Sequence, residues 1–168
     1  MAPNDFLKIG NPRKVQRCLS GVVDQQALDN IELKIREQVQ LFFTLSLKHF
    51  RMAKGQNAQA WRQKVSRFYY AAYTSSRMVR YYCNGDFATD TTDHKKVGDL
   101  PKDFPNRSRY KILLDTLRED RNTGDYDHLA TAKDLVQSCS YWEILVTGFL
   151  QDSAEYLRNK GVNLRGKV

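Results

Sequence analysis

The chain has 168 residues, of which 41% are hydrophobic and 27% charged, the size and composition of one soluble domain with a substantial core. No run approaches the ~18 apolar residues that a membrane span needs, and the N-terminus lacks a signal-peptide pattern, so we expect a cytoplasmic protein. The three cysteines are isolated and have no Cys-x-x-Cys spacing. This argues against a zinc site or a disulfide framework, and neither a metal nor another cofactor is expected.

The net charge of +8 is concentrated in one segment of the chain. Between Glu37 and Asp86 there is no acidic residue, and the segment carries eight basic ones: Lys48, Arg51, Lys54, Arg62, Lys64, Arg67, Arg77 and Arg80. Such a segment favours an anionic partner, with nucleic acid first and a phosphorylated ligand or acidic protein next. A solvated helix face in a basic protein explains the same pattern.

The first predicted elements are an arm or short helix over residues 1–22 and a long helix after it. Asp24 is suited to cap the N-terminus of this helix, which is expected to run to about Lys54 and to end at Gly55. Its apolar residues recur every three or four positions, which predicts one buried face. They are Leu28, Ile31, Ile35, Val39, Phe42, Phe43, Leu47 and Phe50.

A second long helix is predicted to begin after Asn57 as its N-cap and to end near Asn84, where Gly85 suits the position after the helix. Residues 86–106 have the composition of a loop, and a third helix is expected over about 107–120. The next segment, residues 121–128, is predicted to be a loop that is broken at Gly124.

A fourth long helix is predicted from about residue 129 to 159, ended by Gly161 and followed by a mobile tail over 162–168. Its buried stripe is expected to contain Leu129, Ala132, Leu135, Val136, Cys139, Trp142, Val146, Phe149, Leu150 and Leu157. No alternating strand pattern occurs. The sequence therefore predicts an all-α, up-and-down bundle of four long helices with a short N-terminal helix or arm, forming a single domain over residues 1–168.

The second predicted helix carries a row of residues that could bind RNA. Arg67, Tyr70, Thr74 and Arg77 share one face by spacings of three and four, and Arg80 extends the row. Such a face suits the phosphates of a nucleic acid backbone. It equally suits a seam of the bundle with arginines at its edge.

The segment from Arg121 to His128 combines the residue types of metal-independent RNA cleavage. An arginine binds phosphate through its fixed charge and forked donors, and a histidine transfers a proton near neutral pH. Asn122 adds a polar group beside the arginine. A structural explanation is an ion pair of Arg121 with Asp125 that stabilises the turn, with Asp127 as a helix cap.

Two segments in this order resemble the HEPN superfamily (higher eukaryotes and prokaryotes nucleotide-binding domain), in particular its small stand-alone bacterial members. Residues 66–73, Ser-Arg-Phe-Tyr-Tyr-Ala-Ala-Tyr, are similar to their Arg-x-x-Tyr-Ala helix. Residues 121–127, Arg-Asn-Thr-Gly-Asp-Tyr-Asp, are similar to their Arg-x-x-x-Asp-Tyr-Asp loop before the last long helix. Residues 94–97 resemble the entry to the intervening helix. Together these segments span roughly residues 57–160.

The resemblance implies a helical bundle that commonly dimerises. In catalytic members an arginine, a following polar residue and a histidine four to six positions later form a ribonuclease site across two protomers. Arg121, Asn122 and His128 match that pattern at its longest spacing, whereas acids beside the arginine depart from it. We expect Asp125, Tyr126 and Asp127 to structure the loop, with Tyr126 anchored in the bundle.

The resulting hypothesis is a metal-independent endoribonuclease of toxin or phage-defence type. In it Arg121 stabilises the phosphate, His128 is the general acid and base, and Asn122 positions the scissile group. His49 and His94 are expected in core or surface roles. The alternatives are a non-catalytic HEPN module that binds nucleic acid, nucleotide or a partner protein, and a purely structural adaptor. RNA is the expected partner, with a homodimer or a larger assembly that includes an antitoxin or effector protein.

Overall fold

The structure is a computed structural model, and it describes residues 10–86 and 91–168. This part of the chain is all-α, with no strand longer than an isolated bridge between Ser20 and Val23. Its elements are the α-helices α2 (Pro12–Leu19), α3 (Gln25–Lys54), α4 (Trp61–Asn84), α5 (Arg107–Tyr126) and α6 (Cys139–Asn159), and the 3₁₀ helices η1 (Ala58–Ala60), η2 (Thr91–Lys96) and η3 (Ala132–Asp134).

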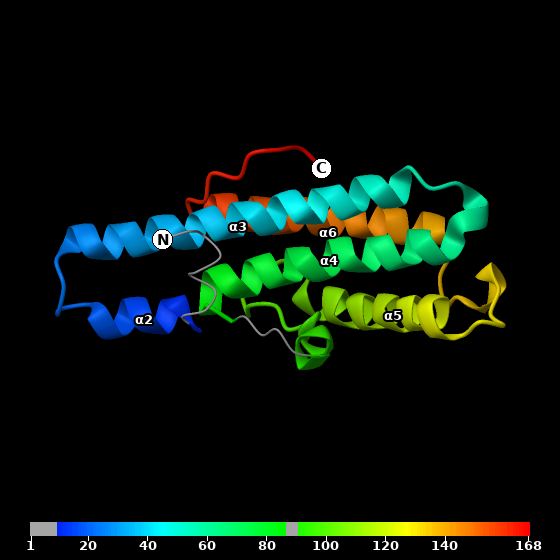
Figure 1. The fold of residues 1–168 in the computed structure, drawn as a ribbon, viewed down its shortest axis with the longest axis horizontal. Coiled ribbons are helices and arrows are strands. Elements are labelled where there is room, and N and C mark those ends of the chain that lie inside the picture. The colour runs from blue at the N-terminus through cyan, green and yellow to red at the C-terminus, as the bar shows by residue number, and fades with distance from the viewer. Residues whose placement is uncertain (1–9, 87–90) are drawn as a thin grey trace.

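The four long helices run alternately up and down, as the sequence predicts (Figure 1). Helix α4 is the central element, since it packs against α3, α5 and α6. The short helix α2 lies beside the N-terminal half of α3 and extends the bundle at one end (Figure 1). The predicted short N-terminal helix is therefore present, and residues 1–9 of the predicted arm lie outside the described part.

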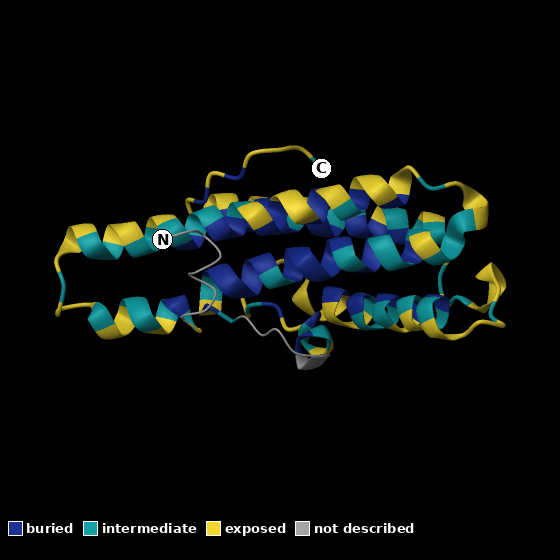
Figure 2. Cartoon of the chain, in the orientation of Figure 1, coloured by how far each residue is buried: buried dark blue, intermediate teal, exposed yellow. Residues whose placement is uncertain are grey.

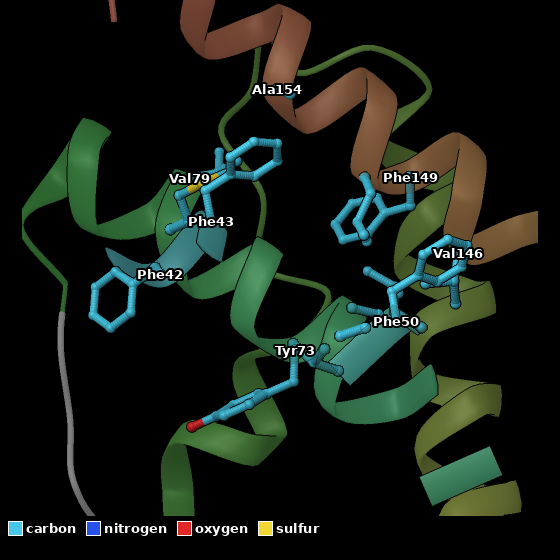
Figure 3. Packing of buried hydrophobic residues seen from close by; sticks show 14 of the residues in the cluster. Phe42, Phe43, Phe50, Tyr73, Val79, Val146, Phe149 and Ala154 are labelled. Atoms are coloured by element: carbon cyan, nitrogen blue, oxygen red, sulfur yellow. The ribbon is translucent and has the colours of Figure 1, made fainter. Parts of the chain in front are cut away.

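The core forms where α3, α4 and α6 face one another (Figures 2 and 3). Phe43, Phe68 and Phe149 are fully buried there, one from each helix. Ala71 and Ala72 of α4 are also buried, and the Ser46 hydroxyl of α3 donates a hydrogen bond to the Ala71 carbonyl oxygen at 2.7 Å. Small side chains at this contact allow the backbones of α3 and α4 to approach closely.

The ends of α3 and α4 follow local signals. The Asp24 side chain accepts a hydrogen bond from the Ala27 amide at 2.8 Å, and Gly55 ends α3. Asn57 caps η1, which leads directly into α4. Gly85 has a φ of +67° after α4, a conformation that disfavours any side chain. A Cβ at Gly85 would also lie 2.0 Å from the Asn11 side-chain oxygen.

The predicted end of the third helix is wrong, because α5 continues through Tyr126. Gly124 does not break the helix: it is buried, and a Cβ there would lie 3.1 Å from a Val65 methyl group. Glycine therefore allows α5 to pack closely on α4, at a cost in helix propensity of about 1 kcal/mol. Arg121 and Asn122 consequently lie on a helix and not on a loop.

The predicted start of the fourth helix is also wrong, because α6 begins at Cys139 with Ser138 as its N-cap. Residues 127–138 form an irregular connection that contains η3, and Leu129 and Val136 are exposed on it. The buried carboxylate of Asp120 holds its far end by accepting hydrogen bonds from the amides of Val136 at 2.6 Å and Gln137 at 3.1 Å. The indole N–H of Trp142 donates to the same carboxylate at 2.7 Å.

The segment 162–168, expected to be a mobile tail, packs along α3. Val162 and Leu164 are buried, and the Arg165 amide donates a hydrogen bond to the Gln40 side chain at 2.8 Å. The physical reason is that the apolar side chains of Val162 and Leu164 are buried in the core of the bundle and hold the segment against it. Among the described residues, no helix has the length and apolar character needed to cross a membrane.

Candidate functional site

Arg121 lies at the C-terminal end of α5, where its guanidinium is surrounded by tyrosines. It donates hydrogen bonds to the hydroxyl of Tyr70 at 2.8 Å and to that of Tyr126 at 3.3 Å. It also donates to the Asn122 side-chain oxygen at 3.1 Å and forms an ion pair with Asp125 at 2.8 Å. These contacts fix the orientation of the guanidinium at the edge of a surface pocket.

This pocket, with a volume of about 580 Å³, lies between α4, α5 and η2. It is lined by Tyr69, His94, Lys95, Asp115, Arg118, Arg121, Asn122 and Tyr126. Three of these side chains are cations and one is an acid, and Arg118 lies 3.8 Å from that acid, Asp115. The lining therefore suits an anion, and the tyrosine rings add surfaces on which a base can stack.

His94 is the histidine of this pocket. Its Nδ1 atom lies 2.8 Å from the Tyr69 hydroxyl, and its ring stacks on Tyr73 with 4.4 Å between the centroids. Burial lowers the pKa of His94 and the charge of Arg121 lowers it further, so its imidazole is neutral near pH 7. In the tautomer that carries its proton on Nδ1 and donates it to the Tyr69 oxygen, Nε2 keeps a lone pair that can accept a proton.

His128, expected to act with Arg121 in a site formed across two protomers, does not line this pocket within one chain. It follows the end of α5 and its side chain is exposed. Its backbone carbonyl oxygen is held by Arg62, which also donates to the carbonyl oxygens of Gly124, Asp127 and Ala130. The physical reason is the additional turn of α5, which carries the chain past the pocket before His128.

Arg77 and Arg80, expected to guide RNA, point instead at a buried carboxylate. Nε of Arg77 and Nη1 of Arg80 each lie 3.0 Å from Asp93, and Arg80 lies 3.1 Å from Asp86 as well. The Arg80 side chain is only 1% exposed, which removes it from the surface that a nucleic acid could contact. The prediction for Arg80 is thus wrong, and Arg77 serves chiefly as a partner of Asp93.

Neither Tyr70 nor Arg67 is part of the pocket lining. Tyr70 supports Arg121 through its hydroxyl, as described above. Arg67 is half-buried, with its Nη1 atom 3.4 Å from Nδ1 of His49. The row predicted on the second helix therefore does not act together: Tyr70 supports Arg121, Arg77 and Arg80 pair with Asp93, and Arg67 contacts His49.

Of the three residues expected to structure a loop, Asp125 pairs with Arg121 within α5. Asp127 follows α5, and its carboxylate accepts hydrogen bonds from the amides of Leu129 at 3.0 Å and Ala130 at 3.2 Å. It does not cap α6. Tyr126 is 69% exposed and is not anchored in the bundle, so its ring remains open to a ligand of the pocket.

Sequence reasoning missed His94, Lys95, Arg118 and Tyr69 as members of one site. No spacing rule connects them, because they come from three separate elements. The available signal was indirect: His94 is the only histidine within the 86–106 loop, and that loop must pass close to the third helix that it precedes.

In residues 10–86 and 91–168, no group of three or more His, Cys, Asp and Glu side chains is arranged to hold a metal ion. Comparison with known proteins gives no matching family model, no similar curated protein and no similar solved structure.

Proposed function

We propose that the protein is a metal-independent endoribonuclease whose active site is the pocket between α4, α5 and η2. The observation that carries the proposal is the meeting of a neutral histidine, His94, with the cations Lys95, Arg118 and Arg121 in one pocket. The resemblance of residues 66–73 and 121–127 to HEPN ribonucleases supports the roles of Arg121 and Asn122, and the proposal departs from that pattern by using His94 in place of His128.

In the proposed reaction His94 accepts the proton of a ribose 2′-hydroxyl through Nε2. The 2′-oxygen attacks the adjacent phosphorus, the bond to the 5′-oxygen breaks, and that oxygen leaves with a proton from water. The products are a 2′,3′-cyclic phosphate and a 5′-hydroxyl end. Arg118, Arg121 and Lys95 stabilise the negative charge that develops on the phosphorane, and Asn122 orients the phosphate.

The electrostatics of the pocket support this assignment of roles. A base must be unprotonated at the working pH, and burial together with the Arg121 charge keeps the pKa of His94 below its ordinary value. Arg121 is held by Tyr70 and Tyr126 before any substrate arrives, so little reorganisation is needed when the phosphate binds.

The test is cleavage of a fluorescently labelled RNA by the purified protein in the presence of EDTA. We expect a 2′,3′-cyclic phosphate product, and no cleavage of the same oligonucleotide with 2′-deoxyribose at every position. His94→Ala and Arg121→Ala should each reduce cleavage by at least about a hundredfold. His128→Ala is the matched control and should cleave like the wild type.

Two results would overturn the proposal in different ways. Full activity of His94→Ala combined with loss of activity in His128→Ala would assign the acid–base role to His128, supplied by a second copy of the chain. Absence of cleavage by a folded wild-type protein, across a panel of RNAs, would overturn the proposed ribonuclease function itself.

A second candidate function is non-catalytic binding of RNA or a nucleotide, and the Arg121–Asp125 ion pair favours it. A carboxylate 2.8 Å from the guanidinium competes with a phosphate for the same donors. Under this function Arg121 and Asp125 stabilise each other, so Arg121→Ala lowers thermal stability and no RNA product is formed by any variant. The affinity for RNA falls steeply as salt rises. Absence of binding at low salt would exclude both functions.

The wider setting is also a proposal that follows from the resemblance. A toxin or phage-defence ribonuclease would arrest growth when expressed alone, and it would act as a homodimer or with an antitoxin or effector protein. Expression of wild type and His94→Ala from the same inducible promoter tests this, since only the wild type should stop growth.

A further inference from the structure

Asp93 is the most completely buried carboxylate next to the proposed active site. Its side chain is 0% exposed and receives three donors: the Tyr73 hydroxyl at 2.6 Å, Nε of Arg77 at 3.0 Å and Nη1 of Arg80 at 3.0 Å. Burial alone raises the pKa of Asp93, but these hydrogen bonds and the two arginine charges lower it below its ordinary value. The carboxylate is therefore ionised and fixed in place by α4.

This cluster is joined to His94 in two ways. Asp93 is the preceding residue of η2, so the anchoring of its side chain fixes the backbone from which His94 projects. Tyr73 contacts both residues: its hydroxyl bonds Asp93, and its ring stacks on His94 at 4.4 Å. Figure 3 shows the Tyr73 hydroxyl directed away from the apolar side chains of the core.

We infer that Asp93, held by Tyr73, Arg77 and Arg80, is a positioning residue that fixes the imidazole of His94 in the pocket. The inference rests on the proposed ribonuclease function and adds a residue that touches neither RNA nor the reacting atoms. It also explains why Arg77 and Arg80 are directed at Asp93. The burial of a charged carboxylate costs free energy that their charges offset and that the Tyr73 hydroxyl alone would not.

Within residues 10–86 and 91–168, the groups that face His94 come from three elements. From α4 they are Tyr69, Tyr70, Tyr73 and Arg77, from α5 they are Arg118 and Arg121, and from η2 they are Asp93 and Lys95. Among these, Asp93 is the acid that raises the pKa of His94, against the lowering effect of the arginines. Removing its charge should therefore lower the pKa of His94 further.

The first experiment uses Tyr73→Phe, which keeps the ring that stacks on His94 and removes only the hydrogen bond to Asp93. Tyr110→Phe is the matched control, because Tyr110 is another buried tyrosine whose hydroxyl donates to an aspartate, Asp152, at 2.7 Å. We expect the two variants to lose similar thermal stability. Only Tyr73→Phe should lose kcat, by roughly tenfold, with KM little changed.

The second experiment follows the imidazole of His94 by NMR titration in wild type and Asp93→Asn. We expect its pKa to fall in Asp93→Asn, and the acidic limb of the cleavage profile to move to lower pH by the same amount. If Asp93→Asn does not fold, Tyr73→Phe carries the test, and its kcat relative to Tyr110→Phe decides the outcome.

The possible failures are distinguishable. An inactive His94→Ala beside a Tyr73→Phe variant with the kcat and pH profile of Tyr110→Phe would overturn the positioning role and leave the ribonuclease intact. A wild type without cleavage would overturn the ribonuclease function. The NMR titration of His94 would still test the effect of Asp93 on the imidazole. An unchanged pKa of His94 in Asp93→Asn would then overturn the positioning role as well.

Discussion

Replacement of Asp120 by alanine is the sharpest test of how α5 and α6 are connected. The substitution removes the carboxylate that accepts hydrogen bonds from the amides of Val136 and Gln137 and from the indole of Trp142. Trp142 is fully buried, so its N–H would be left without a partner in the core. The two amides lie nearer the surface, where water can replace the lost acceptor.

An unsatisfied buried donor costs about 1–3 kcal/mol, and each lost hydrogen bond to a charged group contributes a further ~1 kcal/mol after rehydration. The sum for Asp120→Ala is about 3–5 kcal/mol in the free energy of unfolding. For a domain of this length each kcal/mol corresponds to about 2–4 °C, so we expect the Tm to fall by roughly 10 °C. Calorimetry measures this directly.

Glu119→Ala is the control, because Glu119 is the neighbouring acid on the same helix and is exposed. It should change stability by less than about 0.5 kcal/mol. Hydrogen exchange adds a local readout, in which the amides of Val136 and Gln137 exchange faster in Asp120→Ala alone. Equal Tm values for the two variants would refute the anchored connection and favour a continuous helix from residue 129 to 159.

Three further outcomes follow from single contacts. Arg62→Ala should speed hydrogen exchange over residues 127–131, because Arg62 donates hydrogen bonds to four carbonyl oxygens at and next to this segment. An unchanged exchange rate would show that Arg62 does not stabilise the connection between α5 and α6. Gly85→Ala should cost at least ~1 kcal/mol in urea denaturation, since its φ is +67° and Asn11 occupies the space, and a neutral result would contradict that backbone conformation. The lowered pKa of Asp93 contributes stability that is complete above its unfolded-state pKa and is lost as pH falls through its folded-state pKa. Melting temperatures from pH 6 to about pH 2 should therefore fall less steeply in Asp93→Asn than in wild type, and parallel curves would refute the assignment.

The helices whose ends depend on neighbouring residues in sequence could be predicted. Asp24, Gly55 and Gly85 act on their own helix ends, and the predicted bounds of α3 and the end of α4 agree with the structure. The boundary between α5 and α6 could not be predicted in this way. The helical conformation at Gly124 depends on Val65 across the interface, and the end of the connection depends on Asp120.

The basic segment shows the same distinction for charge. Counting residues predicts a positive surface over residues 38–85, yet the structure pairs Arg77 and Arg80 with Asp93, a residue outside the segment. Arg62 is likewise directed at backbone carbonyl oxygens. The cations that line the pocket, Lys95, Arg118 and Arg121, all come from after the segment. The positive charges of the proposed site are therefore brought together by the tertiary fold, and the basic segment does not supply them.

The choice of histidine has the same origin. Treating residues 121–128 as a loop allows Arg121 and His128 to fold back on each other, and the spacing of the HEPN pattern then has a simple meaning. A helix that continues to Tyr126 separates them, because each helical residue advances the chain by about 1.5 Å along the axis. Within one chain, η2 brings His94 to the pocket that Arg121 lines, and His94 is the proton acceptor in the proposed function. Loss of cleavage in His94→Ala would therefore support a site within one chain, whereas loss of cleavage in His128→Ala would support a site that a second copy of the chain completes.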